Sequence, residues 1–269
     1  MELRRPARGG VHLVGVIHLP PLPGAPRTGP GMDAVIARAV ADARTLQEAG
    51  AHGAIVENLG DAPFAATQVE PVTVAALTAV ALAVRAAAPG LALGVNVLRN
   101  DALAALGIAA VVDAAFVRVN VWTGVMATDQ GLVTGSAREA LQLRQRLGTA
   151  TPVLADVLVK HASPLGTPDL ADVARDTWHR GGAAGLIVSG TGTGRPTRPE
   201  DVARVREAVP DAPLWLGSGL TPDGVPAVAP WLDGAIVGTW LHRDGDLDAP
   251  LDANRVRTLH AALDAVPAA

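Results

Sequence analysis

The residues around position 160 carry the groups best suited to covalent or acid–base chemistry. The segment 156–161 contains Asp156, Lys160 and His161, and Lys160 is the only lysine in a chain with 22 basic residues. An ammonium group can lose its proton when it is buried, or form a Schiff base, whereas a guanidinium group cannot. One lysine kept in so arginine-rich a chain indicates either a chemical role or chance survival.

If this segment is an extended strand, Asp156 and Lys160 point to the same face, because side chains alternate along a strand. In one hypothesis Lys160 forms a Schiff base or acts as a general base, while Glu57 or Asp156 moves protons beside a carbonyl substrate. In the other, Asp156 and Lys160 are a buried ion pair that orients its surroundings. His18 and His161 complete the candidate catalytic set.

The same donor atoms allow a metal site as an alternative. His18, Glu57, Asp156 and His161 are suitable ligands, but no His-x-His or His-Glu-x-x-His spacing fixes a metal locally. We therefore predict no cofactor and no assigned metal ligands, with a divalent metal as the alternative.

Three glycine-bearing segments predict a binding site for a phosphate group. Glycine lets backbone N–H groups approach an anion closely, and a helix N-terminus adds partial positive charge. Segment 189–194 supplies hydroxyl groups or a flexible lid, segment 217–221 opens into a helix, and segment 237–242 starts a short extra helix. The candidate substrate-binding residues here are Ser189, Gly190, Gly192, Gly217, Ser218, Gly219, Gly238 and Thr239.

Other polar residues follow apolar runs elsewhere in the chain. Asn96 and Asn100 could reach the ligand, and Arg118 and Asn120, two residues apart, should face the same side. A buried Arg118 could pair with Glu57 or with a carboxylate or phosphate of the substrate. Burying such groups unpaired costs about 1–3 kcal/mol apiece, so their gathering at strand ends predicts a ligand site.

Eight short apolar runs alternate with amphipathic segments and predict the elements that position these residues. Helix-start residues such as Asp33, Asp101 and Ser136 precede amphipathic segments. Alternating units with near-continuous apolar strands indicate an α/β protein, and eight units close most simply as one (β/α)8 TIM barrel domain, 1–269. A doubly wound open sheet is the alternative. The expected strands are 11–18, 53–57, 91–97, 114–121, 152–158, 184–189, 213–218 and 234–238. The expected long loops are 20–31, 61–71, 122–135 and 160–167.

Composition narrows the class of protein. The net charge of −4 is spread along the chain, so nucleic acid is not expected as a partner, and the absence of cysteine excludes disulfides and thiolate chemistry. The most apolar stretches are interrupted by charges and proline, so we expect no membrane span. No signal peptide is recognised, and we expect a cytoplasmic protein. Homo-oligomerisation is expected from the general frequency of homo-oligomers.

Several short motifs, taken together, resemble the BtpA/SgcQ family, and the match runs essentially end to end. The resemblance implies a barrel of the ribulose-phosphate-binding kind. The family is named for a role in photosystem I biogenesis and has members in bacterial sugar-utilisation gene clusters, but the resemblance implies no particular reaction. The motifs are 16–24, 57–58 with 63–64, 94–101, 116–120, 129–131, 155–162, 189–194, 217–219 and 237–239.

The sequence thus predicts an enzyme that acts on a phosphorylated sugar or related small metabolite at the carboxyl-terminal mouth of the barrel. An aldolase, isomerase or epimerase using Glu57, Asp156 and Lys160 would fit these residues. The alternative is an assembly or stability factor for a larger complex, whose barrel mouth binds a ligand without catalysis.

Overall fold

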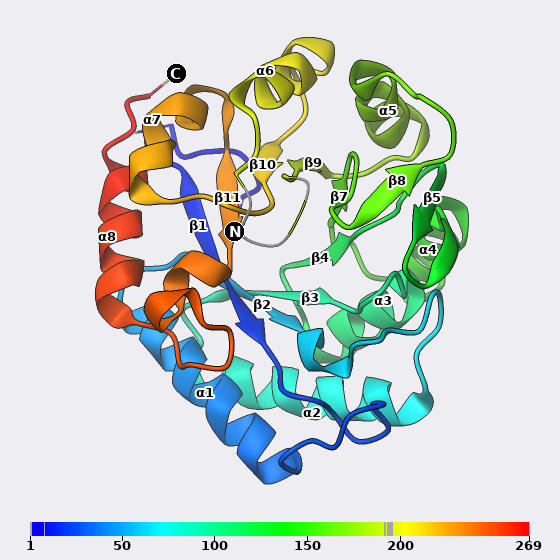
Figure 1. Cartoon of the computed structure of the whole chain (residues 1–269), viewed down its shortest axis with the longest axis vertical. Helices are drawn as coiled ribbons and strands as arrows, with labels where there is room; N and C mark the ends of the chain where they lie inside the picture. Colours follow the sequence, from blue (N-terminus) through cyan, green and yellow to red (C-terminus); the bar gives the residue numbers. More distant parts are fainter. Residues whose placement is uncertain (1, 8, 191, 193–195, 269) are drawn as a thin grey trace.

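The chain folds into a closed barrel of eight parallel strands surrounded by helices (Figure 1). The structure is a computed structural model that describes residues 2–7, 9–190, 192 and 196–268. Closure of the sheet between the first and last strands confirms the predicted barrel and rules out the open sheet. The barrel strands are β1 (His12–His18), β2 (Gly53–Glu57), β3 (Ala92–Asn96), β4 (Phe116–Val119), β7 (Val153–Asp156), β9 (Gly185–Val188), β10 (Leu214–Leu216) and β11 (Gly234–Val237).

All eight predicted strands are present, but several end earlier than expected. The apolar run 152–158 extends past the end of β7 at Asp156, because its last residues already belong to the loop at the barrel mouth. Lys160 therefore lies beyond the strand. The condition under which strand alternation would place Asp156 and Lys160 on one face is not met, and a loop positions the lysine instead.

Helices cover the outer face of the barrel. Asp101 caps its helix as predicted, since its carboxylate accepts a hydrogen bond from the amide of Ala104 at 2.9 Å. Ser136 precedes a helix but makes no side-chain capping bond, and the first helix begins one residue before Asp33. Within the described residues, no helix combines the length and apolar character that crossing a bilayer requires. The helices are α1 (Met32–Glu48), α2 (Pro71–Ala87), α3 (Ala102–Val112), α4 (Ala137–Arg146), α5 (Leu170–Arg175), α6 (Pro199–Ala208), α7 (Val225–Val228) and α8 (Ala253–Asp264).

A small antiparallel sheet lies beside the barrel mouth, where long loops were expected. Its strands, β5 (Val125–Thr128), β6 (Gly131–Thr134) and β8 (Ala162–Pro164), pair in the order β6-β5-β8. It encloses an apolar cluster that includes Met126 and Val159. The segment 157–161 therefore runs between two strands, β7 and β8, and both ends of the loop that carries Lys160 are anchored.

The barrel interior is filled by large side chains that require small residues opposite them. A Cβ atom added to Gly94 would lie 2.4 Å from the ring of Phe116, and one added to Gly234 would lie 2.4 Å from the ring of Trp215. Both rings are fully buried. The interior is therefore a packed core around these two rings, as is usual for this fold.

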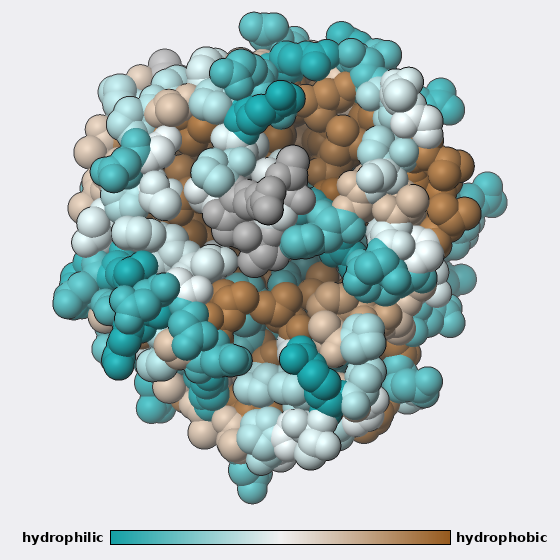
Figure 2. Space-filling model, in the orientation of Figure 1, coloured by the Kyte–Doolittle hydropathy of each residue, from teal (hydrophilic) through white to brown (hydrophobic). Residues whose placement is uncertain are grey.

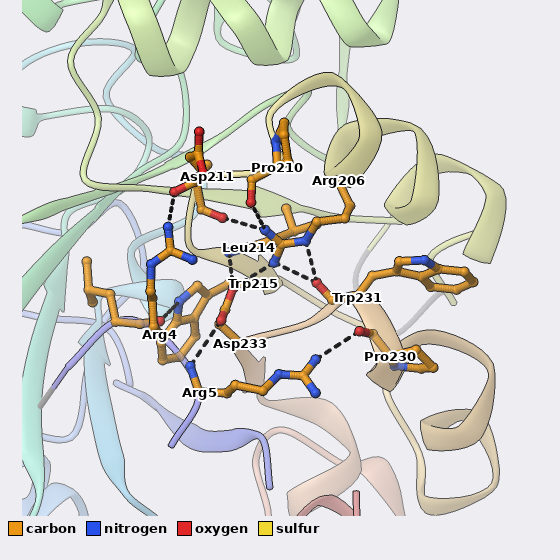
Figure 3. Close-up of polar contacts among 12 residues, drawn as sticks. Arg4, Arg5, Arg206, Pro210, Asp211, Leu214, Trp215, Pro230, Trp231 and Asp233 are labelled. Carbon is orange, nitrogen blue, oxygen red and sulfur yellow. Dashed lines mark hydrogen bonds and ion pairs between the residues drawn. The ribbon is translucent and has the colours of Figure 1, made fainter. Parts of the chain in front are cut away.

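The N-terminal segment is bound to the amino ends of β10 and β11 (Figure 3). The amide of Arg5 donates to Asp233 Oδ1 at 3.0 Å, while Arg206 Nη2 donates to Asp233 Oδ2 at 2.7 Å. The indole of Trp215 donates to the carbonyl of Leu3 at 3.0 Å. These polar contacts stabilise the end of the barrel opposite the mouth, where this fold usually places stability rather than chemistry.

Candidate functional site

Two cavities open at the carboxyl ends of the strands, and both are lined by His18, Glu57, Arg118 and Lys160. We call the first, of about 280 Å³, the glycine cavity, because the loops after β10 and β11 (217–221 and 238–240) form one wall. We call the second, of about 580 Å³, the arginine cavity, because Arg27 and Arg99 line it. Figure 2 shows apolar and polar side chains side by side at the centre of this face.

The glycine cavity contains the residues of two predicted phosphate-binding segments. Gly217, Ser218 and Gly219 come from the loop after β10, and Gly238 and Thr239 come from the loop after β11. Gly219 has a φ of +73°, which favours glycine. A 3₁₀-helix, Thr239–Leu241, begins directly after Gly238, so the short extra helix predicted there is confirmed.

Backbone donors of these loops are available to a ligand. The amides of Gly219, Leu220 and Trp240 donate no hydrogen bond to an acceptor in the described part of the chain. The glycines also serve packing. A Cβ on Gly238 would lie 2.4 Å from the ring of His18, and one on Gly217 would lie 2.3 Å from Ser189 Oγ.

An arginine from the last helix completes the glycine cavity. Arg255 of α8 lines the cavity, and its guanidinium lies 4.6 Å from the centroid of the Trp240 ring. Its Nη1 donates to the carbonyl of Trp240 at 3.2 Å, and its Nη2 lies 3.9 Å from Asp244 Oδ1. The cavity thus combines glycine backbone with a cation that stacking and a hydrogen bond hold in place.

Asp156 anchors the side chains beneath both cavities. Arg118 donates to it through Nε at 3.2 Å and Nη2 at 3.1 Å, Asn120 donates at 2.9 Å, and Ser189 Oγ donates at 3.0 Å. The alternative hypothesis of a buried ion pair between Asp156 and Lys160 is wrong, because the partner of Asp156 is Arg118. The sequence also allowed Arg118 to pair with Glu57 or with substrate, but its guanidinium binds Asp156 instead.

The amine of Lys160 makes no hydrogen bond or ion pair within 4 Å among the described residues, although both cavities expose it. Burial lowers the pKa of Lys160, and the charge of Arg118 lowers it further, against the opposing influence of Glu57 and Asp156. A lowered pKa increases the fraction of uncharged, nucleophilic amine at neutral pH. Of the candidate catalytic groups, this amine is the one best placed to react.

Glu57, at the end of β2, is a buried carboxylate facing the same space. Burial raises its pKa, but His18, Lys160, Arg118 and a hydrogen bond from Asn96 Nδ2 outweigh burial, so the pKa of Glu57 is lowered overall. That hydrogen bond, to Oε2, measures 2.7 Å. Glu57 is therefore ionised at neutral pH and can accept a proton.

A second histidine, absent from the predicted set, fixes the protonation of His18. His242 Nδ1 lies 2.7 Å from the carbonyl of Ala249, which can only accept, so Nδ1 carries the proton. Burial lowers the pKa of His242, so its Nε2 is an acceptor, 3.3 Å from His18 Nδ1. His18 Nδ1 then donates, and its Nε2 has a free lone pair 3.8 Å from Glu57 Oε1. Two acceptors side by side call for a donor between them, such as a substrate hydroxyl or the Lys160 ammonium.

The protonation of His18 predicts how stability changes with pH. Burial lowers the pKa of His18 from 6.5 to about 4. Between these values the unfolded chain binds the proton more readily, so stability falls as the pH drops from 6.5 toward 4, by on the order of 3 kcal/mol from this group. In urea titrations at several pH values, His18→Gln should show a smaller loss over this window than the wild-type chain.

The exposed His179→Gln should retain the wild-type pH dependence and serves as the control. Parallel pH curves for the wild-type chain and His18→Gln would contradict a buried, neutral His18.

Several candidate residues lie away from the two cavities. Ser189 and Gly190 line a different cavity beside the small sheet, and Gly192 is buried outside all three sets of lining residues. Residues 191 and 193–194 of the predicted lid lie outside the described residues. Asn96 holds Glu57, as above. Asn100, expected near the ligand, instead bonds the backbone of Val121 through both its amide atoms, at 2.7 and 2.9 Å.

The predicted metal donors do not form a cluster. Among the described residues, no group of three or more His, Cys, Asp or Glu side chains is arranged to hold a metal ion. The carboxylate of Asp156 is occupied by four donor bonds from Arg118 and Asn120 together with one from Ser189. His161 lines the arginine cavity with a positive φ of 55°.

Three residues of the site had no assigned role at the sequence level. Arg99 directly follows β3, a position that could have drawn attention to it. Arg255 and His242 are brought in by closure of the barrel. His242 was noted only as the last residue of the predicted segment 237–242, and nothing in the local sequence marks Arg255. Short sequence motifs identify glycine-rich loops. Cations and histidines from distant elements reach the site only in the folded barrel, so short motifs do not identify them.

Comparison with known proteins gives matches along nearly the whole chain. The model of the BtpA family matches residues 11–265. The photosystem I biogenesis protein BtpA of Synechocystis sp. is 45% identical over 253 residues, which cover 93% of this chain and 87% of that protein. This similarity extends across the barrel and both cavities.

Solved structures share the fold at low sequence identity. A tryptophan synthase structure from Mycobacterium tuberculosis superposes with a TM-score of 0.60 at 19% identity, covering 96% of this chain and 94% of that one. Thiamine phosphate pyrophosphorylase from Pyrococcus furiosus gives a TM-score of 0.59 at 13% identity, covering 95% and 96%. At such identities the likeness concerns the barrel alone.

Proposed function

The chain belongs to the BtpA family, and from that premise we propose that its barrel mouth is the active site of a lyase or isomerase. The substrate is a phosphorylated sugar or related small metabolite with a carbonyl group. One observation carries this proposal. A single cavity brings the amine of Lys160, the carboxylate of Glu57 and the imidazole of His18 together with Arg255 and the backbone of the loops after β10 and β11.

The phosphate of the substrate occupies the glycine cavity. The amides of Gly219, Leu220 and Trp240, which donate to no acceptor among the described residues, donate to its oxygens, and Arg255 adds a charge-assisted hydrogen bond. The loops after the seventh and eighth strands are the usual phosphate site of these barrels. Holding the phosphate there places the remainder of the substrate against Lys160 and Glu57, which line the same cavity.

Lys160 then forms a Schiff base. Glu57 or His18 first takes one proton from the Lys160 ammonium, and the lone pair of Nζ then attacks the carbonyl carbon. That proton and a second one from Nζ pass to the carbonyl oxygen, which leaves as water, and a protonated imine remains. The imine draws electrons from the adjacent carbon, where either a C–H bond or a C–C bond breaks. In an isomerase Glu57 accepts the released proton, and in a lyase it accepts the proton of the hydroxyl whose carbon departs. His18 Nε2, which lies 3.8 Å from Glu57 Oε1, is a second proton acceptor.

We expect Arg255→Met to weaken the binding of inorganic phosphate by about tenfold or more, because a charge-assisted hydrogen bond is lost. Isothermal titration calorimetry with inorganic phosphate measures the change. Arg257→Met, two residues along α8, removes an exposed arginine that bonds only Asn254 among the described residues, and it should bind phosphate like the wild-type chain. Equal affinities for wild type and Arg255→Met would contradict the phosphate site.

A role in assembling a larger complex is the alternative, and the name of the Synechocystis relative favours it. Such a role would reside on the outer surface and would not need the amine of Lys160. In cells that lack this chain, Lys160→Ala should restore normal growth if the role is assembly, and should fail to do so if the barrel mouth is catalytic.

A further inference from the structure

The arginine cavity contains a buried cation that lacks a counterion. Arg99 is only 5% exposed and lines this cavity. Its guanidinium donates to the carbonyl of Lys160 at 2.6 Å. Among the described residues, no carboxylate oxygen lies within 4 Å of it.

The comparison with Arg118 shows how unusual this is. Arg118 and Arg99 are the two arginines that are buried in the described part of the chain, and Arg118 is paired with Asp156 at 3.1 Å. A buried charge without a partner is strongly unfavourable, and proteins normally pair such groups. Burial also lowers the pKa of Arg99, as expected for a desolvated cation that the carboxylates of Asp156, Asp129 and Glu57 influence only from a distance. Arg99 is thus ready to bind an anion.

A second unsatisfied group lies in the same cavity. Asn120 is 3% exposed, and its Nδ2 donates to Asp156 at 2.9 Å. Its Oδ1 is buried and accepts no hydrogen bond. A ligand with a hydroxyl group beside its anionic group would satisfy Asn120 and Arg99 together.

The remaining walls fit a small, extended molecule. Leu59, Phe64 and Leu98 form an apolar wall of the arginine cavity. The exposed Arg27 also lines the cavity and contributes a second positive charge. Because this cavity and the glycine cavity share Lys160 and Glu57, a molecule that reaches into both passes the reacting groups.

We infer that the arginine cavity binds a carboxylate group of the substrate through Arg99, while Asn120 accepts a hydrogen bond from a neighbouring hydroxyl. The substrate is therefore a phosphorylated sugar acid, with its phosphate in the glycine cavity, its carboxylate at Arg99 and its carbonyl at Lys160. This inference rests on the phosphate site proposed above.

Matched pairs of inert ligands test the inference on the wild-type chain. Each pair has the same phosphate and carbon chain, and differs only in a terminal carboxylate or CH₂OH group. The pairs are 3-phosphoglycerate with glycerol 3-phosphate, 4-phosphoerythronate with erythritol 4-phosphate, and 6-phosphogluconate with sorbitol 6-phosphate. We expect the acid to bind about tenfold or more tightly than the alcohol in at least one pair, by calorimetry.

Arg99→Met should abolish this preference while leaving the affinity for inorganic phosphate at the wild-type value. Arg99→Lys, which keeps the charge, should retain part of the preference. Arg180→Met removes an exposed arginine that is distant from Arg99 in the sequence. This variant should retain the full preference for the acid over the alcohol.

The outcomes are separable. Equal binding of acid and alcohol in all three pairs, with phosphate still bound, overturns the carboxylate site but leaves the phosphate site standing. An unchanged preference in a folded Arg99→Met chain also overturns it, and leaves Arg99 with the purely structural role of holding the Lys160 loop. If the wild-type chain binds no phosphate at all, the proposed function itself is contradicted.

Discussion

Replacing Lys160 by arginine should lower turnover of a phosphorylated carbonyl substrate by about 10³-fold or more, because the nucleophile of the reaction is lost. Arginine keeps the positive charge and much of the volume, but a guanidinium does not form the imine. The same variant should still bind inorganic phosphate, since the amides of Gly219, Leu220 and Trp240 and the side chain of Arg255 are untouched. A loss of turnover with binding retained separates chemistry from recognition.

Borohydride trapping measures the imine directly. Reduction converts the imine to a stable secondary amine, which adds the mass of the bound sugar phosphate to the chain. Because Lys160 is the only lysine, the single other amine is the N-terminus, and one peptide digest assigns the label. Turnover of a screened panel of phosphorylated aldoses, ketoses and keto acids should coincide with labelling of Lys160 in the wild-type chain. Full turnover by Lys160→Arg would contradict the proposed chemistry.

Asp156→Ala should destabilise the fold by about 3–5 kcal/mol, because it leaves the buried guanidinium of Arg118 without its partner. The carboxylate it removes also binds Asn120 and Ser189, at 2.9 and 3.0 Å. The midpoint of urea unfolding, followed by circular dichroism, should therefore fall clearly below that of the wild-type chain.

Asp172→Ala is the matched control for this variant. It removes the same side chain from an exposed ion pair with Arg175 at 2.7 Å, and exposed pairs contribute about 1 kcal/mol or less. A loss for Asp156→Ala no larger than that for Asp172→Ala would contradict the view that Asp156 is the structural anchor of the mouth.

The barrel could be predicted from the sequence because its signals are local and repeated. The runs that became β1, β2 and β11 are mostly apolar and are buried throughout, as is typical of parallel strands in a barrel, and helix signals such as Asp101 lie between strands. The small sheet of β5, β6 and β8 was missed because its strands are three or four residues long and mostly not buried. Such segments carry little periodic signal.

The positions of the site residues were predictable only as far as the strands that carry them. Glu57 follows from the end of β2, and the glycines follow from loops after β10 and β11. The ion-pair partner of Asp156 could not be predicted, since the sequence alone allows Lys160 and Arg118 equally well. Packing decides this, because the guanidinium of Arg118 reaches Asp156 from the neighbouring strand β4.

The pair His18 and His242 shows why other features of the site could not be predicted from the sequence. His18 and His242 are 224 positions apart, and they meet because β1 pairs with β11 when the barrel closes. The direction of the hydrogen bond between them depends on the carbonyl of Ala249, a backbone atom that no side-chain pattern encodes. The charge state of His18 is therefore a property of the assembled mouth.

A crystal structure of the protein grown with inorganic phosphate would show directly which group occupies the barrel mouth. We expect a phosphate in the glycine cavity, hydrogen-bonded to the amides of Gly219 and Trp240 and to Arg255, with the amine of Lys160 facing the same space. An anion bound elsewhere, with the glycine cavity closed or Lys160 turned toward bulk solvent, would contradict this expectation.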